Sequence, residues 1–123
     1  MATQEIRDTN WQLFCEKFKE LHAGTLVTVE SIDGQGVSEI IAQGAQLRDL
    51  RLEKTDACSD LLILWMEDQN NADIVHRMVE PIHLKIRDEG GRKSLQIDAE
   101  SGSTLIHFSS GKIPQVLEGI ETV

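Results

Sequence analysis

The sequence predicts an α+β domain in which an N-terminal amphipathic helix packs on a mostly antiparallel β-sheet. We expect seven to eight strands, in a strongly curled sheet or a partly closed barrel, followed by a short C-terminal helix. Three observations predict this fold: a stripe of aromatic residues at helical spacing near the N-terminus, one run of six apolar residues at 61–66, and several short alternating segments separated by turns. All 123 residues are expected to form a single domain, with residues 1–8 as a partly ordered arm.

The expected helix begins at Thr9, because Thr9 and Gln12 have the spacing of a capping box. Its apolar positions are Trp11, Phe14, Phe18 and Leu21. Spacings of three and four residues place these side chains on one face, so we expect that face to dock on the sheet. Gly24 is expected to end the helix in a left-handed conformation. Cys15, within the helix, is expected to be a buried core residue and not a nucleophile.

The strands are expected at residues 25–32, 37–42, 47–53, 61–66, 74–79, 82–87, 93–99 and 104–109. The segment 61–66 (LLILWM) is too short for a membrane span or a typical helix, and turn-forming residues bound it on both sides. We therefore expect it to be a central strand buried on both faces. Pro114 suits the first residue of a short helix through about Glu118. The residues after that helix are expected to fray.

Composition favours some classes of partner and disfavours others. The chain has 21 acidic and 12 basic residues, and its net charge of −9 repels nucleic-acid backbones and anionic membrane surfaces. The chain has no Tyr and few other aromatic side chains, so few could stack on bases. Its two cysteines have no metal or redox spacing, and the N-terminus does not resemble a signal peptide. We expect a cytoplasmic protein without nucleic-acid or membrane partners.

The candidate pocket residues are three histidines, His76, His83 and His107, on three different expected strands. His83 is predicted to face outward and His107 has the opposite parity to its apolar neighbours, so two of the three could share a solvated face. Convergence on one metal ion would require neighbouring strands with matching faces, and surface or boundary histidines are the favoured interpretation. The sequence has no nucleophile elbow, no complete phosphate-binding loop and no carboxylate pair of fixed separation. We expect no catalytic residue, no metal and no cofactor.

Three groups of residues resemble a bacterial family of small acidic single-domain proteins of unknown function. They are Trp11, Phe14, Phe18, His22, Gly24, Val27 and Val29; then residues 42–47 (AQGAQL); then His76, Val79 and Pro81. The resemblance extends over nearly the whole chain, and its marks are mainly core aromatics, glycines and one proline, which specify a fold and not a reaction. Because no functional residues are established for that family, the resemblance implies none here.

These observations favour a non-enzymatic binding or protein-interaction module over an enzyme. Such a module could form a homo-oligomer or bind another protein through an exposed sheet edge or the outer face of the helix. The alternative is a small-molecule-binding barrel or minor enzyme with a pocket between helix and sheet, in which the three histidines lie near the mouth. The identity of any small-molecule ligand does not follow from the sequence.

Overall fold

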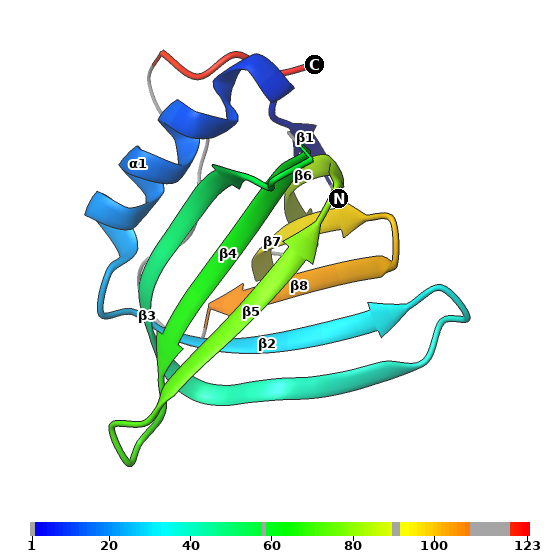
Figure 1. Cartoon of the computed structure of the whole chain (residues 1–123). Helices are drawn as coiled ribbons and strands as arrows, with labels where there is room; N and C mark the ends of the chain where they lie inside the picture. Colours follow the sequence, from blue (N-terminus) through cyan, green and yellow to red (C-terminus); the bar gives the residue numbers. More distant parts are fainter. Residues whose placement is uncertain (1, 58, 90–91, 109–118) are drawn as a thin grey trace.

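The structure is a computed structural model that describes residues 2–57, 59–89, 92–108 and 119–123 (Figure 1). In chain order the elements are β1 (Ala2–Glu5), the 3-10 helix η1 (Asp8–Asn10), α1 (Trp11–His22), β2 (Leu26–Asp33), β3 (Ser38–Lys54), β4 (Asp60–Glu67), β5 (Asp73–Val79), β6 (Pro81–Glu89), β7 (Arg92–Ala99) and β8 (Gly102–Phe108). The predicted α+β class is confirmed. The C-terminal helix expected at 114–118 lies outside the described residues. In the part of the chain that is described, no helix is long and apolar enough to cross a membrane.

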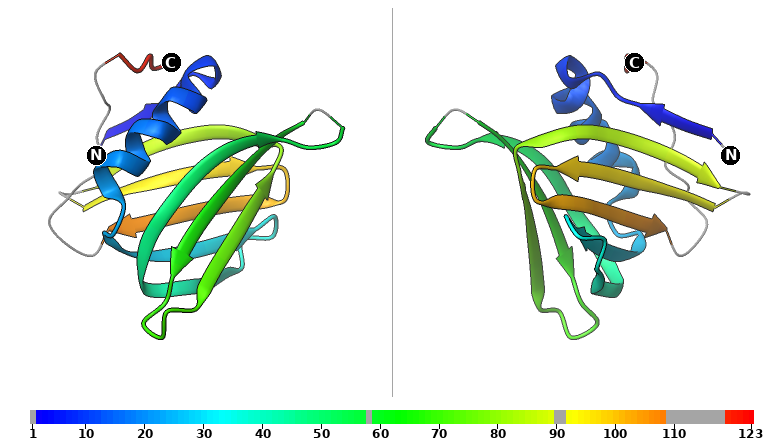
Figure 2. Two further views of the ribbon diagram at one scale, coloured as in Figure 1. Left: turned by 60° about the vertical axis from the view of Figure 1, so that its left-hand side comes forward. Right: turned by 90° about the vertical axis from the view of Figure 1, so that its right-hand side faces the viewer.

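The strands form one antiparallel eight-stranded sheet in the order β1-β6-β7-β8-β2-β3-β4-β5. Strand β4 contacts β6 and β5 contacts β7, although these strands are far apart in that order, so the sheet is strongly curled. Figure 2 shows the curl as two parts of the sheet that face each other, β3–β4–β5 in green and β6–β7–β8 in yellow to orange. The two edge strands, β1 and β5, do not pair with each other. The sheet is therefore strongly curled, as predicted, but it does not close into a barrel.

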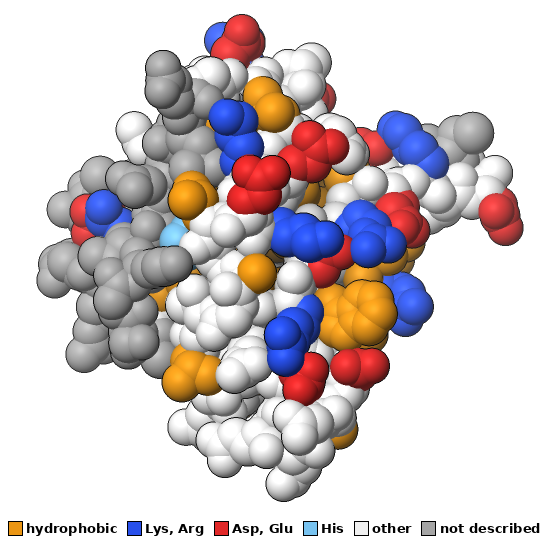
Figure 3. Space-filling view, turned by 90° about the vertical axis from the view of Figure 1, so that its left-hand side faces the viewer, with side chains coloured by type: hydrophobic (Ala, Val, Ile, Leu, Met, Phe, Trp, Pro, Cys, Tyr) orange, Lys and Arg blue, Asp and Glu red, His pale blue; other side chains and the backbone are white. Residues whose placement is uncertain are grey.

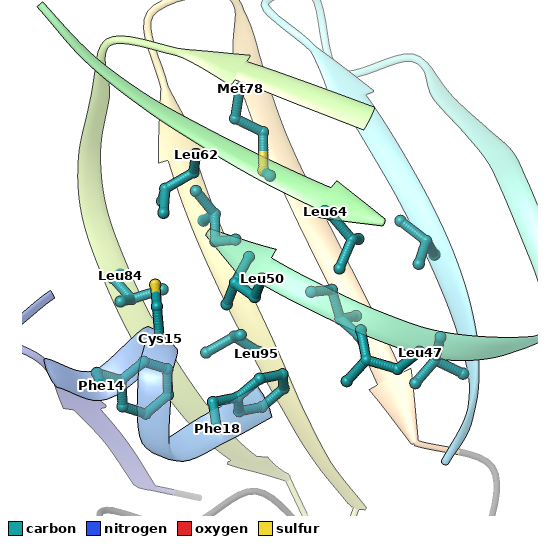
Figure 4. Close-up of a cluster of buried hydrophobic side chains, with 14 of the residues drawn as sticks. Phe14, Cys15, Phe18, Leu47, Leu50, Leu62, Leu64, Met78, Leu84 and Leu95 are labelled. Carbon is teal, nitrogen blue, oxygen red and sulfur yellow. The ribbon is translucent and has the colours of Figure 1, made fainter. Parts of the chain in front are cut away.

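Helix α1 packs on the inner face of the curled sheet. Phe14 and Phe18 are fully buried, with their rings stacked at a centroid distance of 5.5 Å. Figure 4 shows both rings beside Leu50, Leu84 and Leu95 from three different strands. Because these side chains come from both parts of the sheet, the helix joins the two parts through one apolar core. The predicted docking of the aromatic stripe is confirmed.

Three details of the helix differ from the prediction. Asn10, not Thr9, is the N-cap residue, and it makes no side-chain capping bond, so the capping box is wrong. Leu21 is 44 % exposed, whereas His22 is buried against the rings of Phe18 and Phe108. The buried face therefore continues from Phe18 at a spacing of four residues, and the His22 ring takes the place expected for Leu21.

The sheet also differs from the prediction at two places. The segments 37–42 and 47–53 were expected as separate strands, but they form the single long strand β3. Gly44, which falls in the expected gap between these segments, lies inside β3 with φ +63°, and the pairing of β3 has bulges that bend the strand without ending it. Residues 2–5, expected within a partly ordered arm, pair with β6 as the strand β1. The merged strand and the added strand compensate, so the predicted number of strands is confirmed.

The two edges of the sheet differ in whether another segment hydrogen-bonds to them. At the β1 edge, the amide of Val123 donates to the carbonyl of Glu5 at 2.8 Å, and the amide of Arg7 donates to the carbonyl of Glu121 at 3.0 Å. Ile120 is buried in the core, so residues 119–123 are tied to this edge and do not fray. At the other edge, no described strand pairs with the free side of β5.

Candidate functional site

Among the three candidate histidines, His76 faces the interior of the curl. It lies on β5 and is half-buried, and its Nε2 is 2.9 Å from the hydroxyl of Thr104 on β8. Burial lowers the pKa of His76, so the ring is neutral at neutral pH. The hydrogen bond links the β5 edge to β8 across the inner face. This arrangement makes His76 a structural residue that holds the curl.

His83 and His107 lie on the outer face, on strands that β7 separates. His83 Nδ1 is 2.9 Å from a carboxylate oxygen of Glu5, and His107 Nε2 is 3.3 Å from a carboxylate oxygen of Glu30. Each ring therefore pairs with a carboxylate on a neighbouring strand, and the three histidines do not converge. Within the described residues, no group of three or more His, Cys, Asp or Glu side chains is arranged to hold a metal ion.

The outer face of β6, β7 and β8 is a connected polar network. Asp98 accepts hydrogen bonds from Gln96 at 2.7 Å and from Ser103 at 2.6 Å, and Lys85 Nζ lies 3.2 Å from it. Arg87 donates to Gln96 at 3.1 Å. Burial raises the pKa of Asp98, but the hydrogen bonds outweigh this effect and the pKa is lowered overall. The polar groups of this network therefore satisfy one another within the fold.

Strand β4 contradicts the prediction of a central strand buried on both faces. It lies second from the edge, and only its inner side chains, Leu62, Leu64 and Met66, are fully buried. Trp65 points to the other face and is 38 % exposed. The reason is the number of layers: α1 packs on the inner face, and none of the described elements covers the outer face of β4. The apolar run is therefore half core and half surface.

The uncovered side of β4 continues onto β5 as a patch of apolar side chains. We call this patch the apolar stripe; it consists of Leu61, Ile63, Trp65, Val75 and Val79. In the sheet register, Trp65 lies opposite Val75 and Leu61 lies opposite Val79. Directly paired residues on one face of an antiparallel sheet lie close enough to touch, so the stripe is continuous across the two strands.

One arginine borders the stripe on β3, and another, Arg77, lies on β5 between Val75 and Val79; among the described residues only the first is paired. Arg51 on β3 lies opposite Ile63 and makes a double hydrogen bond to Asp49, with nitrogen–oxygen distances of 2.7 and 3.1 Å. Arg77 on β5 lies opposite Ile63 on the other side, and it makes no hydrogen bond or ion pair with any other described residue. The two guanidinium groups, Asp49, Ile63, Trp65 and Val75 surround a shallow hollow of about 250 Å³. The hollow thus combines apolar walls with a guanidinium group that has no partner among the described residues.

A second hollow, of about 350 Å³, lies between α1 and β3, where the alternative prediction placed a pocket. Figure 3 looks at this side of the molecule and shows basic and acidic side chains intermingled on it. Lys19 lies 3.8 Å from Asp49, so the opposing charges on the two walls already pair with each other. Cys15 lies below this hollow and is buried, and its burial, with the charges of Asp49 and Glu16, raises its pKa to about 12. A thiol with this pKa stays protonated and is not a nucleophile.

The exposure of the stripe could have been inferred from features of the sequence outside the apolar run itself. A sheet of eight strands has two faces, and in the described part of the chain one amphipathic helix, α1, covers part of one of them. The segment 47–53 alternates charged and apolar residues, which indicates a solvated outer face beside β4. A strand paired with such a neighbour is expected to share its solvated face. The six successive apolar residues at 61–66 indicate burial on both faces, so they do not show that β4 shares the solvated face of β3.

Comparison with known proteins identifies the family and no function. A family described as "Family of unknown function (DUF5335)" matches residues 2–116, most of the chain. The chain belongs to DUF5335. No curated protein and no solved structure matches it. The candidate site of this DUF5335 protein therefore rests on its own geometry, which selects the apolar stripe with Arg77.

Proposed function

We propose that this DUF5335 protein is a non-enzymatic protein-binding module and that the apolar stripe is its binding surface. The observation that supports the proposal most strongly is an exposed tryptophan within a continuous apolar patch, next to an arginine that has no partner among the described residues. Tryptophan and arginine are enriched among the residues that contribute most to protein–protein binding. A patch of apolar side chains rimmed by polar groups is also typical of interaction sites.

The rim of the stripe can determine specificity. Asp49 and Arg51 on β3 form a charged border on one side of the stripe, and Arg77 lies on the edge strand β5 between Val75 and Val79. An apolar centre with a charged rim is the usual organisation of a protein interface, because the centre loses its water and the rim orients the partner. A carboxylate of the partner that reaches Arg77 would form a pair that Arg77 lacks among the described residues.

The remaining side chains support a binding role over a catalytic one. Each of the three candidate histidines has a single partner within the fold, and Cys15 is buried with a raised pKa. A reduced, buried cysteine and a strongly acidic chain are both compatible with the cytoplasm, which we propose as the location.

Capture followed by reconstitution tests this function. The full chain, Trp65→Ala and Leu13→Ala are used to capture proteins from extracts of the cells that produce this protein, and each captured protein is then purified and titrated by calorimetry. Leu13 on α1 is a matched control, because it is 39 % exposed and Trp65 is 38 % exposed. We expect Trp65→Ala to weaken binding of a purified partner about tenfold or more, as for an interface hot spot, and Leu13→Ala to leave it unchanged. Equal affinity of all three proteins for every purified partner would contradict the proposal.

A second candidate function is small-molecule binding in the hollow between α1 and β3. Its volume of about 350 Å³ falls in the range of ligand pockets, and this is the observation in its favour. A ligand there must separate the Lys19–Asp49 pair, which opposes the idea. The test is a thermal-shift screen with a metabolite library, repeated on Leu52→Trp, which narrows the hollow. Compounds that stabilise the parent chain and not this variant would support the second candidate over the first.

A further inference from the structure

The free edge of β5 differs from the other edge of the sheet in a way that points to a partner strand. Residues 119–123 hydrogen-bond to the β1 edge, whereas no described strand or segment pairs with the free edge of β5. Strand β5 is regular over Asp73–Val79 and contains no proline, no glycine and no bulge. Exposed edges in native proteins are usually interrupted by such features, because a regular edge is a template for another strand.

We propose that a second copy of this chain pairs antiparallel with β5 across a two-fold axis at Val75. In this register Asp73 of each copy lies opposite Arg77 of the other copy, and the two Val75 side chains lie opposite each other. The proposal rests on the proposed function, since it names the partner of the same surface. The two outer faces then join into one surface across the dimer.

The charges on β5 select this register over its alternatives. Side chains alternate along a strand, so two copies keep their outer faces aligned only if the axis passes through a residue position. An axis at Arg77 would place two guanidinium groups opposite each other, which is destabilising. An axis at His76 would place Asp73 opposite Val79 and Val75 opposite Arg77. The axis at Val75 forms two opposite-charge pairs and gives Arg77 a partner, which it lacks among the residues that the structure describes in one copy.

The same register makes the apolar stripe continuous between the copies. Trp65 lies opposite Val75 within one chain, so the pairing creates a row of Trp65, Val75, Val75 of the second copy and Trp65 of the second copy. Neighbouring strands lie about 4.8 Å apart, which lets the large indole reach toward the second Val75. The partner strand therefore gains main-chain hydrogen bonds along the edge and apolar contacts on the outer face.

The expected association is weak. One pair of seven-residue strands buries less surface than a standard interface, and each copy carries a net charge of −9, which opposes approach. Interfaces at the small end of the range are typical of transient complexes, and we expect a dissociation constant of about 10 to 100 μM.

Sedimentation equilibrium of the full chain at physiological ionic strength tests this pairing. The variants are Asp73→Arg, Arg77→Asp and the double variant, which restores the net charge and exchanges the partners. Each single variant places like charges opposite each other, so we expect the dissociation constant to rise about tenfold or more. The double variant is expected to regain most of the parent affinity. Lys17→Asp on α1 changes the net charge as Arg77→Asp does, and we expect little effect from it.

Four outcomes are distinguished, with circular dichroism and the urea midpoint showing that each variant is folded. Weakening by both single reversals with recovery in the double variant supports the pairing. A parent chain that stays monomeric at about ten times the expected dissociation constant would overturn it. A dimer that responds equally to Lys17→Asp and Arg77→Asp, or that is not recovered in the double variant, would also overturn it. A monomeric chain whose purified partner still depends on Trp65 would overturn the second copy as occupant but leave the proposed function intact.

Discussion

The outer faces of β6–β7–β8 and of β3–β4–β5 belong to the same sheet and both face solvent, yet they are built differently. On the first, Asp98 holds Gln96, Ser103 and Lys85 in one network. On the second, apolar side chains run across two strands and Arg77 has no partner among the described residues. Exposure to water explains the composition of the first face and not of the second. This difference is what the proposed binding role of the β3–β4–β5 face predicts.

The largest difference in the free energy of unfolding is expected between two variants of α1. Phe18 is buried between α1 and the sheet, so Phe18→Ala should lower the free energy of unfolding by about 3 to 5 kcal/mol. Leu13 lies on the solvent side of the same helix, and Leu13→Ala should change it by less than about 0.5 kcal/mol. Urea denaturation measures both. Similar midpoints for the two variants would mean that the helix face does not form the core.

The next comparison uses neighbouring residues on β4. Leu64 is fully buried on the inner face and Trp65 is on the outer face. We expect Leu64→Ala to cost about 2 to 5 kcal/mol, because it leaves a cavity in the core. Trp65→Ala should cost only about 1 kcal/mol, since much of the indole is already in water. If Trp65→Ala cost as much as Leu64→Ala in chemical denaturation, the outer face would belong to a buried layer.

The smallest difference in the free energy of unfolding is expected between variants of the charged groups on the two outer faces. Asp98→Asn should cost about 1 to 3 kcal/mol at neutral pH, because the carboxylate accepts hydrogen bonds from several partners. Arg77→Gln should be neutral within about 0.5 kcal/mol in the monomer. Denaturation of dilute samples at several pH values measures both.

The pH dependence of Asp98 has a definite sign. Its pKa in the folded chain is lowered, so its contribution is complete above the unfolded pKa of about 3.9 and is lost as pH falls through the folded value. The difference between the parent and Asp98→Asn should therefore shrink in acid. A difference that stays constant down to the acid limit would mean that Asp98 is not held as a carboxylate by this network.

The parts of the fold that the sequence predicted correctly are those with a strong local period. The aromatic spacing of α1 and the alternation in β6, β7 and β8 depend on one face being buried, so the pattern is visible in the chain itself. Strand β1 has no such pattern: Ala2–Glu5 is short and mostly polar, and it is a strand because β6 offers it hydrogen bonds. The position of Gly44 inside β3 likewise depends on bulges that only the paired strands define.

The candidate site could be predicted only in part, for a related reason. The three histidines are candidates because imidazole can bind metal ions and line pockets. Their separation in space depends on strand order, which one sequence does not specify. Trp65 was assigned to the core because six apolar residues in succession are typical of a strand covered on both faces. Whether a second layer exists to cover that strand is a property of the whole chain.

The fluorescence of the two tryptophans of the chain reports whether Trp65 is exposed on the outer face of β4. Trp11→Phe leaves Trp65 as the reporter, and Trp65→Phe leaves Trp11, which is buried with its indole donating to the carbonyl of Ile6 at 3.0 Å. Acrylamide quenching of the fluorescence of each folded variant, at dilute concentration, compares the two sites. We expect strong quenching and red-shifted emission from Trp65, and weak quenching and blue-shifted emission from Trp11. Equal protection of the two indoles would contradict an uncovered outer face on β3–β4–β5.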